Sequence, residues 1–323
     1  MLSIKEVQMH KPIDISKDAT FLVTGGTGLV GRALVRELML QGYQNIASVG
    51  SKDCDLRDGV AVASLMKEVC PDYIFHLAAR VHGLGGNAKY KSDILVDNTL
   101  INTHVIEQAR ISGVKKIVAM GSGCVYPELK GQQELFEDQV FLGAPHSSED
   151  SYAHSKRLML AQLNAASTQY GLSSAFVISG NLYGPHDNFN IEDGHVIPSL
   201  IAKFYAAKKN NVPVKVWGSG VAIRDFTHAD DMARALIVIL GSIEGAVNTG
   251  SGQRHPIADI VNSLQRYTGV PVEWDSSKPD GQLVRYYNLD RLISAGFSAK
   301  TNLTDGICST YDWYENNILS VRR

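Results

Sequence analysis

Thr24-Gly25-Gly26-Thr27-Gly28-Leu29-Val30-Gly31 stands between an apolar run, Ala19–Val23, and an amphipathic stretch, Gly28–Gln41. This order predicts a buried strand, a tight turn and a helix whose N-terminus faces the turn. Glycines at 25, 28 and 31 have the spacing of loops that receive a pyrophosphate. The first permits the turn, the second lets the backbone approach the phosphates, and the third lets helix and strand pack closely. The stretch indicates a dinucleotide site. The alternative, a glycine-rich turn without a ligand, is disfavoured by the flanking strand and helix.

The same alternation of apolar runs and amphipathic stretches continues through the first half of the chain. We expect strands at Ala19–Val23, Asn45–Val49, Tyr73–Leu77, Lys116–Met120 and Ser174–Ile178, and helices at Gly28–Gln41, Val60–Val69, Asn98–Ile111 and Tyr152–Tyr170. Continuous apolar strands that alternate with helices predict an α/β fold, a Rossmann-type doubly wound parallel sheet.

After about Gly180 this rhythm ends. Gly, Pro, Asn and His crowd Gly180–Pro198, which predicts a loop. Further helices are expected at Pro198–Lys208, Asp230–Leu240, Ile257–Tyr267 and Thr304–Asn316, and strands at Val214–Trp217 and Ala246–Thr249. We therefore expect an N-terminal extension (1–18), a Rossmann domain (19–180, with parts of 222–250 returning to it) and a smaller C-terminal α/β substrate-binding region (181–323).

The composition excludes several classes of protein. With 31 Lys and Arg against 33 Asp and Glu in 323 residues, the net charge of −2 offers no field for nucleic acid. The longest apolar run, Ala235–Leu240, is far shorter than the roughly 20 residues of a membrane span. The first 18 residues lack the apolar core of a secretory signal. Four scattered cysteines match no metal or redox spacing and fit a cytoplasmic protein, without a metal.

The end of the second predicted strand bears on which dinucleotide is bound. Ser48-Val49-Gly50-Ser51-Lys52 lacks the acid that usually binds the 2′-hydroxyl of NAD. Lys52 is suited to a 2′-phosphate, which favours NADP(H); the alternative is a solvated surface charge. Asp55 and Leu56 are expected near the adenine. The small residues that end the third strand, where the cofactor would pass, are Leu77, Ala78 and Ala79.

A second motif carries acid–base chemistry. Tyr152 and Lys156 are four residues apart, so they share one face of a helix. We expect the ammonium to lower the phenol pKa from about 10 and to make Tyr152 a general acid toward a carbonyl that receives hydride. Ser122 follows the fourth strand, where its hydroxyl could hold the same oxygen. Cys124 and His195 are a possible base and acid; the alternatives are a small buried apolar residue and a structural loop histidine.

Taken in order, the glycine loop, Ser122, Tyr152 and Lys156 resemble the extended short-chain dehydrogenase/reductase family. Within that family, four further segments resemble the GDP-L-fucose synthases, which are 3,5-epimerase/4-reductases of GDP-4-keto-6-deoxy-D-mannose. The segments are Asn181–Pro198, Val216–Gly220, Arg224–Phe226 and Ser277–Gly281. The resemblance covers nearly the whole chain after about residue 18.

The resemblance implies a role for each site residue. Cys124 would be the base and His195 the acid of epimerisation, while Tyr152 and Ser122 hold the enolate oxygen and Tyr152 gives the final proton. Lys156 would bind the nicotinamide ribose. Asn181, Leu182 and His195 are implied as further cofactor contacts, and Lys203, Trp217, Arg224 and Lys278 as contacts of the GDP-sugar. A homodimer through the helices near 98–111 and 152–170 is also implied.

The chain departs from the family pattern at positions that bear on the sugar. Ser179-Gly180 replaces Pro-Thr, Gly123 replaces a hydroxyl residue, and Lys203 stands where Arg is common. Asp225 replaces Glu or Gln, and Arg80–Gly83 is less rich in glycine. The alternatives are therefore a C4-reductase of a related GDP-4-keto sugar such as a heptose, with or without epimerisation, and a non-catalytic nucleotide-sensing protein. Intact Ser122, Tyr152 and Lys156 disfavour the latter.

Overall fold

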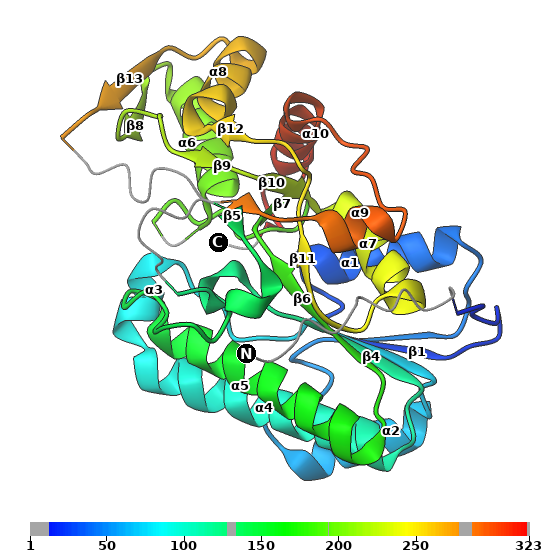
Figure 1. Ribbon diagram of the computed structural model, residues 1–323. Helices are drawn as coiled ribbons and strands as arrows, with labels where there is room; N and C mark the ends of the chain where they lie inside the picture. Colours follow the sequence, from blue (N-terminus) through cyan, green and yellow to red (C-terminus); the bar gives the residue numbers. More distant parts are fainter. Residues whose placement is uncertain (1–12, 128–133, 193, 278–285, 322–323) are drawn as a thin grey trace.

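The computed structural model describes residues 13–127, 134–192, 194–277 and 286–321. Its centre is a six-stranded parallel sheet in the order β11-β6-β4-β3-β1-β2 (Figure 1). The strands are β1 (Phe21–Thr24), β2 (Ile46–Val49), β3 (Tyr73–His76), β4 (Lys116–Met120), β6 (Ser174–Ser179) and β11 (Gly245–Thr249). The predicted Rossmann-type α/β fold is confirmed, and each of these strands begins and ends within two residues of its predicted bounds.

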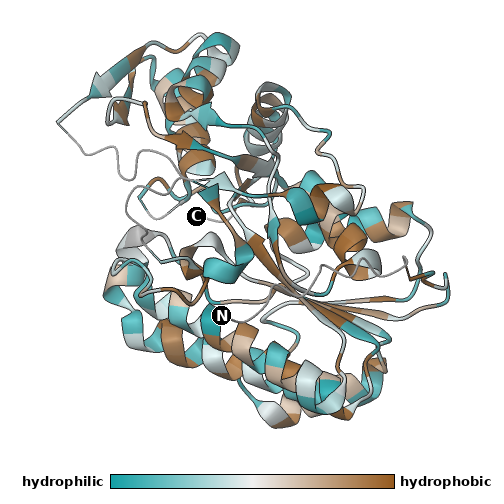
Figure 2. Cartoon of the chain, in the orientation of Figure 1, coloured by the Kyte–Doolittle hydropathy of each residue, from teal (hydrophilic) through white to brown (hydrophobic). Residues whose placement is uncertain are grey.

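Side chains that alternate along each strand build two core layers. Phe21 and Val23 on β1 face α1 (Leu29–Leu40) and α7 (Ala229–Ser242). Leu22 faces the opposite layer, which contains α2 (Gly59–Val69), α4 (Lys91–Ile111) and α5 (Asp150–Tyr170). Figure 2 shows strands that are mostly hydrophobic, with helices of mixed hydrophobic and hydrophilic residues packed around them. Because both faces of the sheet are covered, the strands are largely apolar.

A smaller lobe lies above the carboxyl ends of the strands (Figure 1). Its core joins α6 (Val196–Asn210), α8 (Ile257–Thr268) and α10 (Leu303–Asn316) to β8 (Val214–Trp217). The other elements here are β13 (Val272–Asp275), which pairs with β8, and the short pairs β7 (Asn181–Tyr183) with β10 (Phe226–His228) and β9 (Ile223–Arg224) with β12 (His255–Pro256). β14 (Tyr286–Tyr287) pairs with β5 (Glu134–Leu135).

Two of the predicted elements need correction. The helix expected to begin at Asn98 begins at Lys91, because buried Ile94 continues its inner face; the inward residues Asn98 and Asn102 are polar and hid the apolar stripe. The stretch Gly180–Pro198 is not all loop, since it contains β7 and the start of α6. Two short helices, α3 (Leu84–Lys89) and α9 (Asp290–Ser294), were not expected, because both have six residues or fewer.

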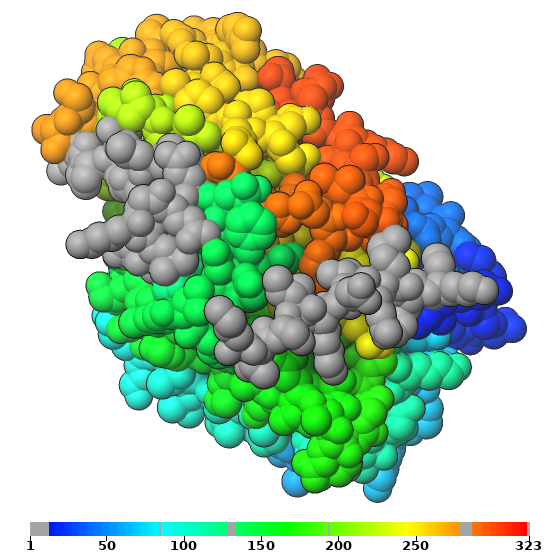
Figure 3. All heavy atoms as spheres, viewed as in Figure 1, coloured from blue at the N-terminus to red at the C-terminus, as the bar shows by residue number. Residues whose placement is uncertain are grey.

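Segments from the two ends of the chain meet on the sheet domain. Phe297 is buried in the same layer as Ala19, and Ile15 and Ala299 pack against that layer. Figure 3 shows blue and orange segments, from the first and the last parts of the sequence, on the same side of the molecule. Within the described ranges, no helix has both the length and the apolar character needed to cross a membrane.

Candidate active site

One cleft runs across the carboxyl ends of the parallel strands and below the smaller lobe. Its volume is about 1600 Å³, which exceeds the roughly 300–1,000 Å³ of a site for one small molecule. The cleft therefore has room for two ligands. The predicted site residues that line it are Gly25, Thr27, Gly28, Leu29, Val30, Gly31, Asp55, Leu56, Leu77, Ala78, Ala79, Ser122, Cys124, Tyr152, Lys156, Asn181, Leu182, His195 and Arg224.

The glycine loop has the geometry of a phosphate cradle. Gly25 has a φ angle of +71°, which a side chain would strain, and a Cβ there would lie 2.8 Å from the amide nitrogen of Ala78. At Gly31 a Cβ would overlap the carbonyl oxygen of Gly25 and lie 2.6 Å from the Cα of Gly26. Gly28 caps α1 in an extended conformation. The first turn of α1 thus faces the cleft with unpaired amides, which attract an anion.

Two arginines, and not Lys52, line the cleft near the end of β2. Lys52 is exposed and lies outside the lining, whereas Arg32 and Arg57 belong to it. Arg57 donates two hydrogen bonds to the carboxylate of Asp55, at 2.8 and 2.9 Å, which hold the pKa of Asp55 at about 2. Arg57 was not among the cofactor contacts expected from the sequence, although its position, eight residues after the end of β2, could have indicated one.

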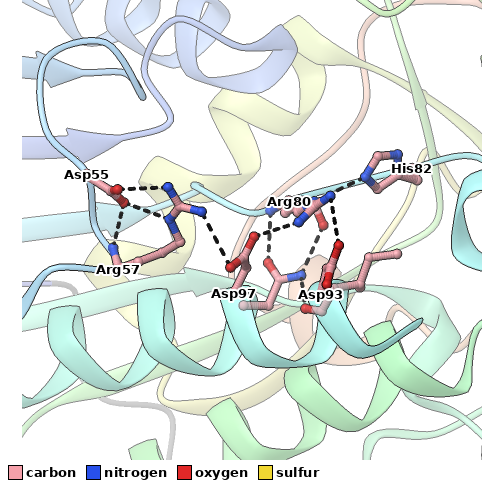
Figure 4. Close-up of polar contacts among 8 residues, drawn as sticks. Asp55, Arg57, Arg80, His82, Asp93 and Asp97 are labelled. Atoms are coloured by element: carbon pink, nitrogen blue, oxygen red, sulfur yellow. Dashed lines mark hydrogen bonds and ion pairs between the residues drawn. The ribbon is translucent and has the colours of Figure 1, made fainter. Parts of the chain in front are cut away.

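Arg57 belongs to a chain of ion pairs that crosses the cleft wall (Figure 4). Its Nη1 lies 3.5 Å from Oδ1 of Asp97 on α4, and Arg80 Nη1 donates to the other oxygen of Asp97 at 2.8 Å. Arg80 also donates to Nε2 of His82, at 3.3 Å, and lies 3.7 Å from a carboxylate oxygen of Asp93. Asp97 thereby fixes two cationic side chains that follow different strands.

Tyr152 and Lys156 lie one turn apart on α5, but their electrostatics differ from the expectation. Lys156 is buried; its Nζ donates to the carbonyl of Met120 at 2.7 Å and lies 5.7 Å from the centroid of the Tyr152 ring. Burial lowers the pKa of Lys156 to about 8. Burial, together with negative charge at Cys124 and Glu149, raises the pKa of Tyr152 above its ordinary value. The expected lowering of the tyrosine pKa was therefore wrong, and Tyr152 is a protonated hydrogen-bond donor at neutral pH.

Ser122 and Cys124 share a tight turn that follows β4. Ser122 caps a single turn of 3₁₀ helix, η1 (Gly123–Val125), and its hydroxyl accepts from the amide of Cys124 at 3.4 Å. Cys124 is 8% exposed and lines the cleft. Both residues line the cleft, so this turn brings the hydroxyl and the thiol to the same site.

His195 enters the cleft from the other lobe. It caps the N-terminus of α6, its side chain is 55% exposed, and its Nδ1 lies 3.9 Å from a carboxylate oxygen of buried Asp187. The fold therefore brings a thiol, a phenol and an imidazole from three separate elements to one cleft. This is a set of groups suited to moving protons to and from a carbonyl compound.

Three predicted substrate contacts stand apart from this group. Lys203 Nζ lies 4.9 Å from the centroid of the Trp217 ring, and burial lowers the pKa of Lys203, but neither residue lines the cleft. Lys278 lies outside the described residues. Within the described ranges, no three His, Cys, Asp or Glu side chains gather as a metal site would require.

Comparisons with known proteins agree with this geometry. Residues 21–250 match the NAD dependent epimerase/dehydratase family. GDP-L-fucose synthase 1 of Arabidopsis thaliana is 36% identical over 94% of this chain and 95% of its own length.

Two solved structures are similar over nearly the whole chain. A GDP-L-fucose synthetase from Naegleria fowleri, bound to NADP, superposes with a TM-score of 0.91 at 31% identity and covers 100% of both chains. A GDP-D-glycero-L-gluco-heptose synthase from Campylobacter jejuni gives 0.86 at 25% identity, over 94% of this chain and 100% of its own. The chain therefore belongs to the NAD dependent epimerase/dehydratase family and, within it, to the GDP-L-fucose synthase family.

Proposed function

We propose that this protein is an NADPH-dependent enzyme that epimerises C3 and C5 of GDP-4-keto-6-deoxy-D-mannose and reduces C4 to give GDP-L-fucose. The observation that carries the proposal is the meeting of Ser122, Cys124, Tyr152, Lys156 and His195 in one cleft. The full-length similarity to a GDP-L-fucose synthase of Arabidopsis supports it.

Epimerisation follows from the groups on either side of the sugar. The C4 ketone acidifies the protons on C3 and C5, so a base as moderate as a thiolate can remove them. At each of the two carbons, Cys124 takes the proton from one face and His195 delivers a proton to the opposite face. Proton exchange with water returns both groups to their starting states between the two epimerisations. Tyr152 and Ser122 donate hydrogen bonds to the C4 oxygen, where the negative charge of the enolate gathers. The raised pKa of Tyr152 keeps its proton in place for that hydrogen bond.

Reduction uses the same oxygen-binding pair. Bound NADPH supplies the hydride that C4 receives. Tyr152 then transfers its proton to the C4 oxygen, and the buried ammonium of Lys156 stabilises the phenolate that remains. We also assign the nicotinamide ribose to Lys156, and the hydrogen bond from its Nζ to the carbonyl of Met120 at the end of β4 supports this assignment.

The cleft fits a phosphorylated dinucleotide. A Cβ at Gly31 would close the cradle at the start of α1, and Asp55 and Leu56 lie where the adenine would reach the end of β2. We assign the 2′-phosphate to Arg32 and Arg57, because both line the cleft there and Lys52 does not. Arg57 is well prepared for this contact, since Asp55 and Asp97 hold its guanidinium from two sides.

The nucleotide-sugar end is built by the smaller lobe. Arg224 lines the cleft from β9 and is suited to the diphosphate of GDP. Lys203 and Trp217 lie together beyond the lining and, with Lys278, are proposed to contact the nucleotide where the cleft opens.

We propose a homodimer that forms through α4 and α5. These helices pack side by side and expose apolar side chains: Leu95, Val96, Leu100 and Leu158 are 37–50% exposed. A four-helix arrangement would bury them. A molar mass of twice the chain in light scattering is the expected result, and a monomer that persists at all concentrations would contradict it. All four cysteines are free thiols, which supports a cytoplasmic location.

A related C4-reductase of a GDP-4-keto-heptose is the second candidate. Its support is the structural similarity to the Campylobacter heptose synthase and the presence of Arg80 and His82, two polar side chains, in the cleft lining. The first test supplies purified protein with GDP-4-keto-6-deoxy-mannose and NADPH and follows loss of NADPH absorbance. Turnover supports the leading proposal. No oxidation with this sugar, but oxidation with the heptose analogue, would replace it by the second.

A further inference from the structure

At two glycine positions in the cleft wall, the backbone conformation does not require glycine. Gly123 lies between Ser122 and Cys124, and Gly180 precedes Asn181. Neither belongs to the glycines with a positive φ angle, so a residue with a side chain could adopt either conformation. What excludes a side chain at these positions is the space around them.

Tyr287 fills that space. A Cβ at Gly123 would overlap the hydroxyl oxygen of Tyr287 and lie 2.8 Å from its Cζ. A Cβ at Gly180 would lie 2.9 Å from Cε2 of the same ring. The phenol end of Tyr287 therefore lies against the turn that carries Ser122 and Cys124, and the edge of its ring lies against the turn that leads to Asn181.

Several contacts fix Tyr287 in this place. β14 pairs in parallel with β5, so Tyr287 lies opposite Leu135. The amide of Asn288 donates to the carbonyl of Leu135 at 2.9 Å. The ring centroid of Tyr287 lies 5.9 Å from that of buried Tyr126, whose hydroxyl donates to Asn248 at 2.6 Å. Tyr287 is thus a half-buried, anchored residue that also lines the cleft.

We propose that Tyr287 is a positioning residue of the epimerase centre, which holds the Ser122–Cys124 turn and the Gly180–Asn181 turn at a fixed separation and so sets where Cys124 meets the sugar. This inference rests on the proposed function for its chemistry, and on the steric contacts alone for its geometry. Proton removal next to a ketone needs the base close to one C–H bond, and misplacement by about 1 Å lowers rates by about 100-fold. Proton abstraction is therefore the step most sensitive to this contact.

A stability cycle tests the geometry without any substrate. Gly123→Ala and Gly180→Ala should each lower Tm by a few degrees, because each Cβ would press on Tyr287. Tyr287→Leu should relieve both. Tyr287→Phe should partly relieve Gly123→Ala, where the overlapping atom is the hydroxyl oxygen, but should not relieve Gly180→Ala, where it is a ring carbon. Additive effects throughout would overturn the inference.

An exchange assay tests the chemistry. In deuterium oxide, with sugar and NADPH at saturating concentrations, Tyr287→Leu should incorporate label at C3 and C5 of the sugar about 10-fold more slowly than the natural protein. Gly123→Ala/Tyr287→Leu should be no slower than Tyr287→Leu. Label incorporation by Tyr287→Leu at the rate of the natural protein would overturn the positioning role. If the natural protein itself incorporates no label, the proposed function fails, and the stability cycle still decides the place of Tyr287.

Discussion

The Nζ of Lys156 lies 5.7 Å from the centroid of the Tyr152 ring and donates a hydrogen bond to the carbonyl of Met120 at 2.7 Å. Burial lowers the pKa of the lysine to about 8 and raises that of the tyrosine. The pair thus holds one ammonium that is near its point of deprotonation and one phenol that keeps its proton.

The first prediction concerns the pH dependence of reduction. The Lys156 ammonium is present below pH 8 and is lost above it. The kcat for NADPH oxidation should therefore fall with an apparent pKa near 8, because the phenolate formed at Tyr152 loses its cationic partner. Rates across the alkaline range measure this, with melting curves at each pH as the control for stability. A rate that stays flat to pH 10 would show that Lys156 does not act in this way.

The second prediction separates the two reactions. Cys124→Ser should lower the deuterium incorporated at C3 and C5 by about 100-fold, because a serine hydroxyl is far less acidic than a thiol and supplies almost no anionic base near neutral pH. NADPH should still bind with unchanged affinity. Tyr152→Phe should instead lower hydride transfer most strongly. Cys308→Ser is the matched control, since Cys308 lies on α10 and outside the cleft lining. Equal exchange in Cys124→Ser and Cys308→Ser would remove the thiol from the mechanism.

The third prediction assigns the recognition of the 2′-phosphate. Arg57→Met should raise the KM for NADPH about 10-fold, the effect of losing a charge-assisted hydrogen bond of 1.5 kcal/mol or more, and should change the KM for NADH little. Lys52→Met should leave both values nearly unchanged, because Lys52 is exposed outside the lining. A larger increase in the KM for NADPH in Lys52→Met than in Arg57→Met would instead assign the 2′-phosphate to Lys52.

The fourth prediction concerns a buried lysine outside the cleft. Lys116 Nζ donates to the carbonyls of Ile239 and Leu240, at 3.1 and 2.8 Å, near the C-terminus of α7. Lys116→Met leaves those carbonyls without this donor, so it should lower the free energy of unfolding by about 1–3 kcal/mol. The exposed neighbour serves as control, and Lys115→Met should cost less than about 1 kcal/mol.

The same lysine predicts how that difference varies with pH. Burial lowers the pKa of Lys116 to about 8, from 10.5 in the unfolded chain. Between pH 8 and pH 10.5, Lys116 is protonated in the unfolded chain but largely neutral in the folded protein. The stability contributed by Lys116 therefore rises with pH over this range, by up to about 1.4 kcal/mol per pH unit. In denaturant titrations from pH 7 to 10, the free energy of unfolding of the natural protein should increase relative to that of Lys116→Met. Parallel curves would mean that the pKa is not lowered.

Strands and helices with a regular hydrophobic pattern could be predicted from the sequence alone. Phe21–Val23 and Ile117–Met120 are continuous apolar runs, as expected for strands of a sheet that is covered on both faces. Asn98 and Asn102 are buried but polar, and they separate Ile94 from the apolar residues further along α4, so the start of this helix was not recognised from the sequence. Strands of two or three residues such as β9 and β14 exist only through their partners, and no local pattern encodes them.

The site divides in the same way. Gly25, Gly31, Tyr152 and Lys156 belong to short motifs whose spacing follows from the geometry of a turn or a helix. The position of the Arg57 side chain could not be predicted from the sequence. It depends on an ion pair with Asp97, which is 40 positions further along the chain and approaches Arg57 only in the folded protein. The direction of the Tyr152 pKa was missed for a related reason, since burial is a property of the fold and outweighs a lysine at helical spacing.

The most direct test of the account is the isotopic composition of the product. The natural protein should convert GDP-4-keto-6-deoxy-mannose and NADPH in deuterium oxide to a GDP-6-deoxyhexose that carries solvent deuterium at both C3 and C5. Its C4 hydrogen should come from the cofactor. A reduced product with unlabelled C3 and C5 would show a simple C4-reductase and would contradict the assignment of Cys124 and His195 to epimerisation.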